Sequence, residues 1–156
     1  MPANIDPVYS RIGASGNSTI AAPTAAFATQ FGATANTTLD LSTTTGSQII
    51  FSSDATNGSF LRSIVIKWSG TSQTQASSAA VMRFWWNNGA TVGTAGNQVL
   101  WKEFTLPVIT PSASATTPDY EIPCNVLLPP GHKIYAAISA TQTTNGYHVF
   151  GIGGHL

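Results

Sequence analysis

The sequence predicts an all-β fold: an antiparallel β-sandwich, of the jelly-roll type, preceded by an extended N-terminal arm. Two observations predict it. Short runs rich in Val, Ile, Phe, Tyr and Trp alternate with polar residues and are separated by Gly, Pro and Asn turn signals. No stretch repeats its apolar residues with the 3.6-residue period of an amphipathic helix. Six or seven strands spaced in this way are typical of a sandwich, and 156 residues can bury the core of one such domain.

Residues 1–45 are expected to form the extended arm, with one or two short strands. Their apolar residues stand singly among Gly, Ala, Ser and Thr, and only residues 38–42 alternate as a strand would. The arm is expected to lie against its own domain or against a neighbouring subunit. Its phenylalanines Phe27 and Phe31 are candidate anchors for a contact between subunits.

Residues 46–156 are expected to form the sandwich domain. Polar or turn-rich segments separate its strands, among them the long uncharged connection at residues 107–118. Seven segments have the composition of strands: Gln48–Phe51, Phe60–Trp68, Ala80–Trp86, Gln98–Leu106, Tyr120–Leu127, Lys133–Ala140 and Gly146–Ile152.

Simple alternation predicts which side chains share a face of each strand. In the second segment it places Phe60 with Ile64, Ile66 and Trp68, and it places Leu61 on the opposite face. In the fourth segment, Leu100, Lys102, Phe104 and Leu106 are expected to share one face, opposite Trp101. Pro123 lacks a backbone N–H, so its strand is expected at a sheet edge or at a bulge.

Charged residues are scarce, with six Lys/Arg and six Asp/Glu, or 8% of the chain. An average soluble domain is about a quarter charged. A surface with few charges and a formal net charge of zero has little electrostatic repulsion to keep neighbouring molecules apart. This favours a protein that is part of an assembly. The scattered basic residues cannot form a patch for nucleic acid or for an anionic membrane, and no apolar run reaches the roughly 18 residues that span a bilayer. Neither nucleic acid nor a membrane is an expected partner.

Few residues suit catalysis or metal binding. Cys124 is the one cysteine, and the three histidines lack the spacing of a metal site. Asp119 and Glu121 share a strand face, where such a pair more often promotes solubility than acid–base chemistry. The sequence contains neither a Gly-x-Ser-x-Gly elbow nor a glycine-rich phosphate loop. We expect no enzymatic activity, no catalytic residue, no metal and no cofactor.

The tryptophans are the most distinctive candidates for function. Trp85 and Trp86 are adjacent in a strand, so one should point toward the core and the other outward, and the sequence leaves open which does which. An outward Trp suits a protein interface or stacking on a sugar ring, whereas both rings could instead be partly covered by loops or by the arm. Because acids are scarce, a subunit contact is favoured over a sugar site, and both residues are candidate interface anchors.

Several turn-forming segments resemble those of a known group of proteins: Asp54–Leu61, Leu106-Pro107 with the Ser/Ala/Thr/Pro loop after it, Leu128–Ile134 and Gly151–Gly154. Across residues 46–156 the chain resembles small virion proteins of tailed bacteriophages and prophages, some of which are head decoration (cement) proteins.

The resemblance implies a β-sandwich protein on the outer surface of the phage head, often a homotrimer, that bridges neighbouring major capsid proteins and stabilises the shell. It brings no catalytic residues. Tail and fibre proteins use similar sandwiches. A carbohydrate- or receptor-binding module of a phage tail or fibre is therefore the alternative expectation.

Overall fold

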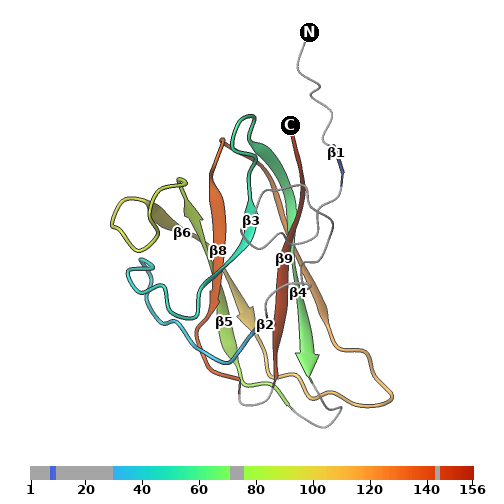
Figure 1. Cartoon of the computed structure of the whole chain (residues 1–156). Coiled ribbons are helices and arrows are strands. Elements are labelled where there is room, and N and C mark those ends of the chain that lie inside the picture. Colours follow the sequence, from blue (N-terminus) through green and yellow to red (C-terminus); the bar gives the residue numbers. More distant parts are fainter. Residues whose placement is uncertain (1–7, 10–29, 71–75, 143–144) are drawn as a thin grey trace.

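The computed structural model describes residues 8–9, 30–70, 76–142 and 145–156, which contain nine β-strands and no helix (Figure 1). Within these ranges, accordingly, no helix is long and apolar enough to cross a membrane. The strands are β1 (Val8–Tyr9), β2 (Gln30–Phe31), β3 (Gln48–Ser52), β4 (Ser59–Gly70), β5 (Ala80–Asn87), β6 (Gln98–Leu106), β7 (Asp119–Leu128), β8 (Lys133–Ile138) and β9 (Asn145–His155).

The strands form two antiparallel sheets. The first sheet has the order β1-β9-β4-β7, with β2 also paired to β9, and the second has the order β3-β8-β5-β6. Apart from β1 the pairing is nested: β5 pairs with β6, β4 with β7, β3 with β8 and β2 with β9. The chain is therefore arranged as one long hairpin whose successive strand pairs lie alternately in the two sheets. The all-β, antiparallel part of the prediction is confirmed.

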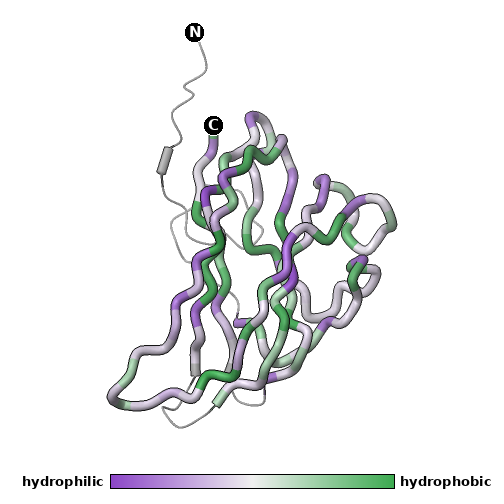
Figure 2. The backbone as a smooth tube through the Cα atoms, turned by 180° about the vertical axis from the view of Figure 1, so that it is seen from behind, coloured by the Kyte–Doolittle hydropathy of each residue, from purple (hydrophilic) through white to green (hydrophobic). Residues whose placement is uncertain are grey.

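One hydrophobic cluster lies between the two sheets. Ile64 and Ile66 of β4 are fully buried in it together with Phe84 of β5 and Ile134 of β8, so both sheets contribute to a shared core. The sandwich-like layering is visible from both sides (Figures 1 and 2). Burial of this shared apolar surface is the main force that holds the two layers together.

A β-bulge in β4 reverses the expected alternation at the start of that strand. The register against β9 shifts between Leu61 and Ser63, because β4 has one residue more than β9 there. As a result Leu61 is fully buried in the core while Phe60 is only half-buried. The predicted faces of these two residues are wrong for this reason. The prediction for Pro123 is confirmed, since β7 is an end strand and its register against β4 also shifts next to this residue.

A second bulge lies between β5 and β6. Phe84 pairs with Lys102 but Trp85 pairs with Leu100, so Trp101 is the extra residue. Trp101 therefore packs against the central core, and Leu100 packs on the opposite face of the sheet. Simple alternation in this strand predicts the reverse for both residues.

Residues 36–45 cover the outer face of the second sheet. Leu41 is buried there against Trp85, Tyr135 and Ala137. Asn36 holds this segment in shape, because its side-chain amide donates to the carbonyls of Thr43 and Thr45 at 2.6 and 2.9 Å. This part of the predicted arm thus packs on its own domain, whereas residues 1–7 and 10–29 lie outside the described residues.

Candidate functional site

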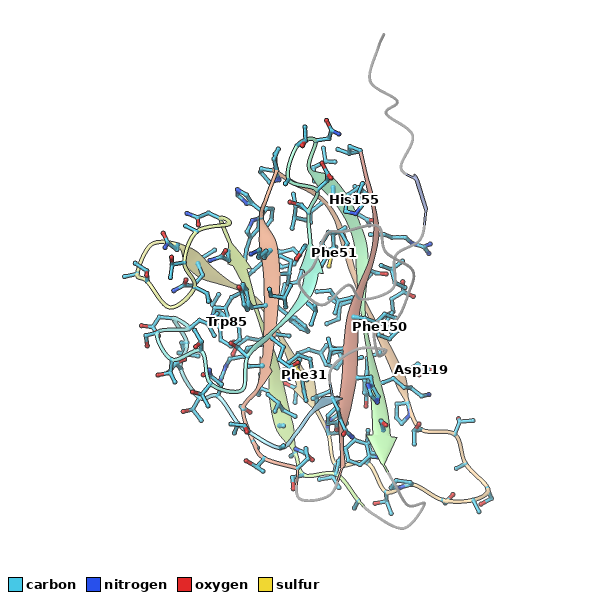
Figure 3. All side chains as sticks on the ribbon, in the orientation of Figure 1. Phe31, Phe51, Trp85, Asp119, Phe150 and His155 are labelled. Atoms are coloured by element: carbon cyan, nitrogen blue, oxygen red, sulfur yellow. The ribbon has the colours of Figure 1, made fainter. Side chains whose placement is uncertain are left out.

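The two sides of the layered fold differ. On one side, β3 and β9 approach closely, and the ring of Phe51 packs against the glycines of β9 (Figure 3). On the other side lie β6 and β7, the end strands of the two sheets, each of which has one edge without a strand partner among the described residues. These two strands lie at the back of Figure 1 and face the reader in Figure 2.

The side between β6 and β7 carries partly exposed apolar side chains, and we call it the open seam. All of its members are half-buried, and the apolar ones pack against the edge of the central core. The open seam consists of Trp86, Trp101, Lys102, Phe104, Tyr120, Ile122, Cys124 and Val126. Proteins commonly bind one another through surfaces of this kind, in which partly exposed apolar side chains lie next to unpaired strand edges.

Aromatic side chains connect the two edges of the open seam. The rings of Phe104 and Tyr120 lie 4.9 Å apart between centroids, so β6 and β7 touch through side chains at this point. Near the other end of β6, the rings of Trp86 and Trp101 meet edge to face with centroids 5.6 Å apart. Such aromatic contacts give the seam a defined shape.

A hydrogen bond fixes one histidine at this aromatic end. The indole N–H of Trp86 donates to Nδ1 of His132 at 2.7 Å. Nδ1 must therefore be unprotonated, and the ring proton of a neutral His132 lies on Nε2. Val99, which pairs with Trp86 in the sheet register, is 62% exposed and extends the apolar surface of this end.

Cys124 and Lys102 lie together in the open seam. Burial raises the pKa of the Cys124 thiol, and the nearby ammonium group of Lys102 offsets part of that increase. The thiol is a free, half-buried side chain that packs against the core. The Nζ atom of Lys102 lies 5.1 Å from the centroid of the Trp101 ring, which is a cation–π distance.

The four predicted anchor residues have different positions. Phe31 and Trp85 are 2% and 0% exposed, so their side chains are already packed inside the subunit (Figure 3). Trp86 belongs to the open seam, and Phe27 lies outside the described residues. The two adjacent tryptophans do point to opposite faces, but residues 36–45 cover the outer one, and the indole N–H of Trp85 donates to the carbonyl of Leu39 at 2.8 Å.

The polar residues near the C-terminal end of β9 stabilise turns through hydrogen bonds. The Ser59 hydroxyl lies 2.7 Å from Nδ1 of His155 and accepts the backbone N–H of Asp54 at 2.9 Å. Ser59 is completely buried, so it is not placed to attack a substrate. In the described ranges, no group of three or more His, Cys, Asp or Glu side chains could hold a metal ion. Asp119 forms an ion pair with Lys67.

Of the members of the open seam, Trp86 alone is predicted as an anchor, and the others, among them Trp101 and Lys102, are not. The sequence contains two signals for the open seam. Lys102 interrupts the otherwise apolar face of its strand, and Pro123 indicates an edge position for the facing strand.

Comparisons of this chain with protein-family models, with curated proteins and with solved structures each found no match.

Proposed function

We propose that this protein is a non-enzymatic structural protein of a tailed-phage virion, a decoration protein on the outer surface of the head. In this role it binds neighbouring major capsid proteins and bridges them. The open seam is the observation that carries the proposal, because unpaired strand edges lined by half-buried apolar groups favour association. The sequence resemblance supplies the head as the place of assembly.

The scarcity of charge supports a role in which much of the surface is in contact with neighbours. Residues 107–118 form a long connection without a charged side chain, and most of it is exposed. Uncharged Ala, Ser, Thr and Pro residues can pack against another subunit without the cost of desolvating ions. If the protein is a homotrimer, three weak contacts act together and the avidity rises without any new kind of contact.

We also infer that the sandwich is a jelly roll. The nested pairing of β2 with β9, β3 with β8, β4 with β7 and β5 with β6 supports this, because a jelly roll places eight such strands in two sheets. The first of these strands, β2, is only two residues long. Jelly rolls occur in viral capsid proteins and in lectins, so this fold is compatible with the leading function and with the alternative.

The alternative function is a carbohydrate- or receptor-binding module of a phage tail or fibre. One observation favours it: Trp86, Trp101 and His132 meet at one partly exposed end of the open seam, with Lys102 beside them. Tryptophan rings stack on sugars, and the Nε2–H of His132 and the ammonium of Lys102 are donors for sugar hydroxyls. Specific, saturable glycan binding that Trp101→Ala abolishes in a folded protein would establish this function in place of decoration.

Binding to heads tests the leading function. Heads from a phage that carries this gene, purified from a mutant lacking the gene, are mixed with the purified protein and sedimented. The proposal predicts saturable binding at a fixed number of copies per capsomer, and heads that withstand higher temperature when decorated. Binding should weaken in Trp101→Ala and Lys102→Glu but not in Arg62→Glu, a matched charge reversal at an exposed position on the central strand β4. Failure to bind heads, together with binding to purified tails, would overturn the proposal.

A further inference from the structure

Three asparagines of the sequence are followed directly by glycine, in the pairs Asn57-Gly58, Asn88-Gly89 and Asn145-Gly146. Asparagine is a chemically labile residue, because a backbone nitrogen can attack its side-chain amide. A following glycine favours this attack, since it has no side chain to keep its own nitrogen away from the amide carbon. The attack requires that the side-chain amide of the asparagine and the backbone N–H of the glycine are both free to move. The structure differs between the three pairs in this respect.

At Asn57 both groups are nearly free. Asn57 is exposed in the turn between β3 and β4, at the upper end of Figure 1, and no hydrogen bond among the described residues holds its side-chain amide. The N–H of Gly58 donates to the carbonyl of Asp54 at 3.3 Å, beyond the usual limit of about 3.2 Å. The same carbonyl accepts the N–H of Gly131 at 3.0 Å, so it keeps a partner when Gly58 moves away.

At Asn88 both groups are held. The N–H of Gly89 donates to Oδ1 of Asn87 at 2.8 Å, and Oδ1 of Asn88 accepts the N–H of Ala90 at 3.0 Å. Both distances are those of ordinary hydrogen bonds. Asn88 is as exposed as Asn57 in class, so access to water does not distinguish the two sites. The hydrogen bonds at Asn88 must break before its amide can be attacked.

The third pair is held by the sheet. Asn145 and Gly146 begin β9, where they lie opposite Gly70 and Ser69 of β4. A backbone that is paired in a ladder keeps its extended shape, and it can close a ring only after local opening of the strand.

We propose that Asn57 is a site of selective deamidation in the folded protein. The nitrogen of Gly58 gives up its proton to the solvent and bonds to Cγ of Asn57. The bond between Cγ and Nδ2 breaks, and the leaving nitrogen takes a proton from the solvent and departs as ammonia. Water then opens the cyclic imide. Cleavage of the new bond to Cγ gives an aspartate at position 57, and cleavage of the original main-chain bond gives an isoaspartate. Water is the only co-reactant.

Both products disturb the turn. The new carboxylate lies close to that of Asp54, which accepts the backbone N–H groups of Thr56 and Asn57, so two like charges come together. An isoaspartate also lengthens the backbone by one carbon directly before Gly58. That glycine has a φ of 81°, and a Cβ atom on it would lie only 2.5 Å from the carbonyl oxygen of Leu128. The turn therefore packs too closely on Leu128 to accept a longer chain. The inference goes beyond the decoration function, because the reaction involves one chain and needs no head.

Peptide mapping by mass spectrometry tests the selectivity. The full-length protein is incubated at mildly alkaline pH, once folded and once unfolded in urea, and conversion at the three asparagines is followed. Folding should slow the reaction at Asn57 by less than about threefold, because one weak hydrogen bond opposes it. It should slow the reaction at Asn88 by at least about tenfold, because two ordinary hydrogen bonds must break, and the reaction at Asn145 at least as much. Equal slowing at Asn57 and Asn88, or conversion of Asn57 only in urea, would overturn the inference.

The stability of the aged protein tests the consequence. Asn57→Gln keeps an amide, but its longer side chain cannot form the five-membered imide, so this variant is the matched control. The midpoint of urea denaturation should fall with time of incubation in the wild type and stay constant in Asn57→Gln. The isoaspartate fraction, separated by chromatography, should be less stable than freshly prepared Asn57→Asp, which has the new charge without the longer backbone. An equal decline in the wild type and in Asn57→Gln would contradict the proposed site.

Discussion

The ring of Phe51 occupies the space that a side chain on Gly151 would need. A Cβ atom at Gly151 would lie 2.9 Å from Cδ2 of Phe51 and 3.1 Å from Cδ1 of Leu61. Phe51 is on β3 and Gly151 is on β9, so the absence of a side chain lets these two strands of different sheets approach closely on this side. The opposite side is formed by β6 and β7, whose apolar side chains remain half-exposed. Closure on one side and exposure on the other give the molecule its candidate binding surface.

Gly151→Ala is expected to lower the free energy of unfolding by about 1–3 kcal/mol, because the added methyl group overpacks the contact with Phe51. Urea denaturation measures the change. In a Phe51→Leu background the same substitution should cost less, since the ring that it meets has been removed. An equal cost in both backgrounds would mean that the contact between Phe51 and Gly151 does not limit the approach of the two sheets.

Leu41 combines complete burial with a left-handed backbone, at φ 56°. Leu41→Ala removes the buried side chain but keeps the strained backbone, and it should cost about 2–4 kcal/mol. Leu41→Gly also removes the side chain but relieves the strain, so it should be at least as stable as Leu41→Ala. In an unstrained position glycine is the less stable of the two. The stabilities of the two variants are compared by their denaturation midpoints. A glycine variant that is clearly less stable than the alanine variant would contradict the inference that the backbone of Leu41 is strained.

Substitutions of Trp85 and Trp101 are expected to have different effects, the first on the stability of the fold and the second on binding to heads. Trp85→Ala should destabilise the fold by about 3–5 kcal/mol, because it empties the cluster beneath residues 36–45 and leaves the Leu39 carbonyl without its donor. Trp101 is half-buried at an edge, so Trp101→Ala should cost clearly less while it removes much of the open seam. Thermal unfolding and head binding are measured on both variants. Similar losses of stability would show that the open seam is part of the core.

Stability is expected to decline in acid below about pH 3.8, the ordinary pKa of an aspartate. Hydrogen bonds from Ser42 lower the pKa of Asp40, and those from the backbone of Asn57 and Thr56 lower that of Asp54. The unfolded chain therefore takes up these protons at a higher pH than the folded protein does. The stabilisation is complete above pH 3.8 and is lost as the pH falls through the folded-state pKa values.

Urea denaturation over a range of acidic pH tests this dependence. The double variant Asp40→Asn/Asp54→Asn should lose stability less steeply than the wild type below about pH 4, because its amides do not titrate. Glu121→Gln, which removes an exposed carboxylate on β7, is the matched control and should keep the wild-type slope. Identical slopes for the wild type and the double variant would exclude these two carboxylates as the cause.

The strands are largely predictable from the sequence, because alternation and turn residues act locally. Residues Gln98–Leu106 are expected as a strand with the same bounds that β6 has, and the other predicted strands of the sandwich domain differ from the observed ones by one to three residues at their ends. The faces are less predictable. A bulge depends on how many residues the partner strand provides at that point. The sequence of the bulged strand alone does not give that number.

The candidate site is predictable only in part, for the same reason. Trp101 reaches the open seam because the bulge opposite Phe84 and Trp85 turns it toward the core. The burial of Trp85 depends on Leu41 and on the backbone of Leu39, residues more than 40 positions away that the sequence assigns to an arm. Composition favours a protein that works in an assembly, but only the tertiary fold shows which side of the described residues has half-exposed apolar groups.

The position of the protein in an electron cryomicroscopy reconstruction of the virion that carries its gene tests the central claim most directly. The decoration function predicts density for the fold on the outer surface of the head, where each copy contacts more than one major capsid protein. Density for this fold at the tail or its fibres, with none on the head lattice, would contradict it.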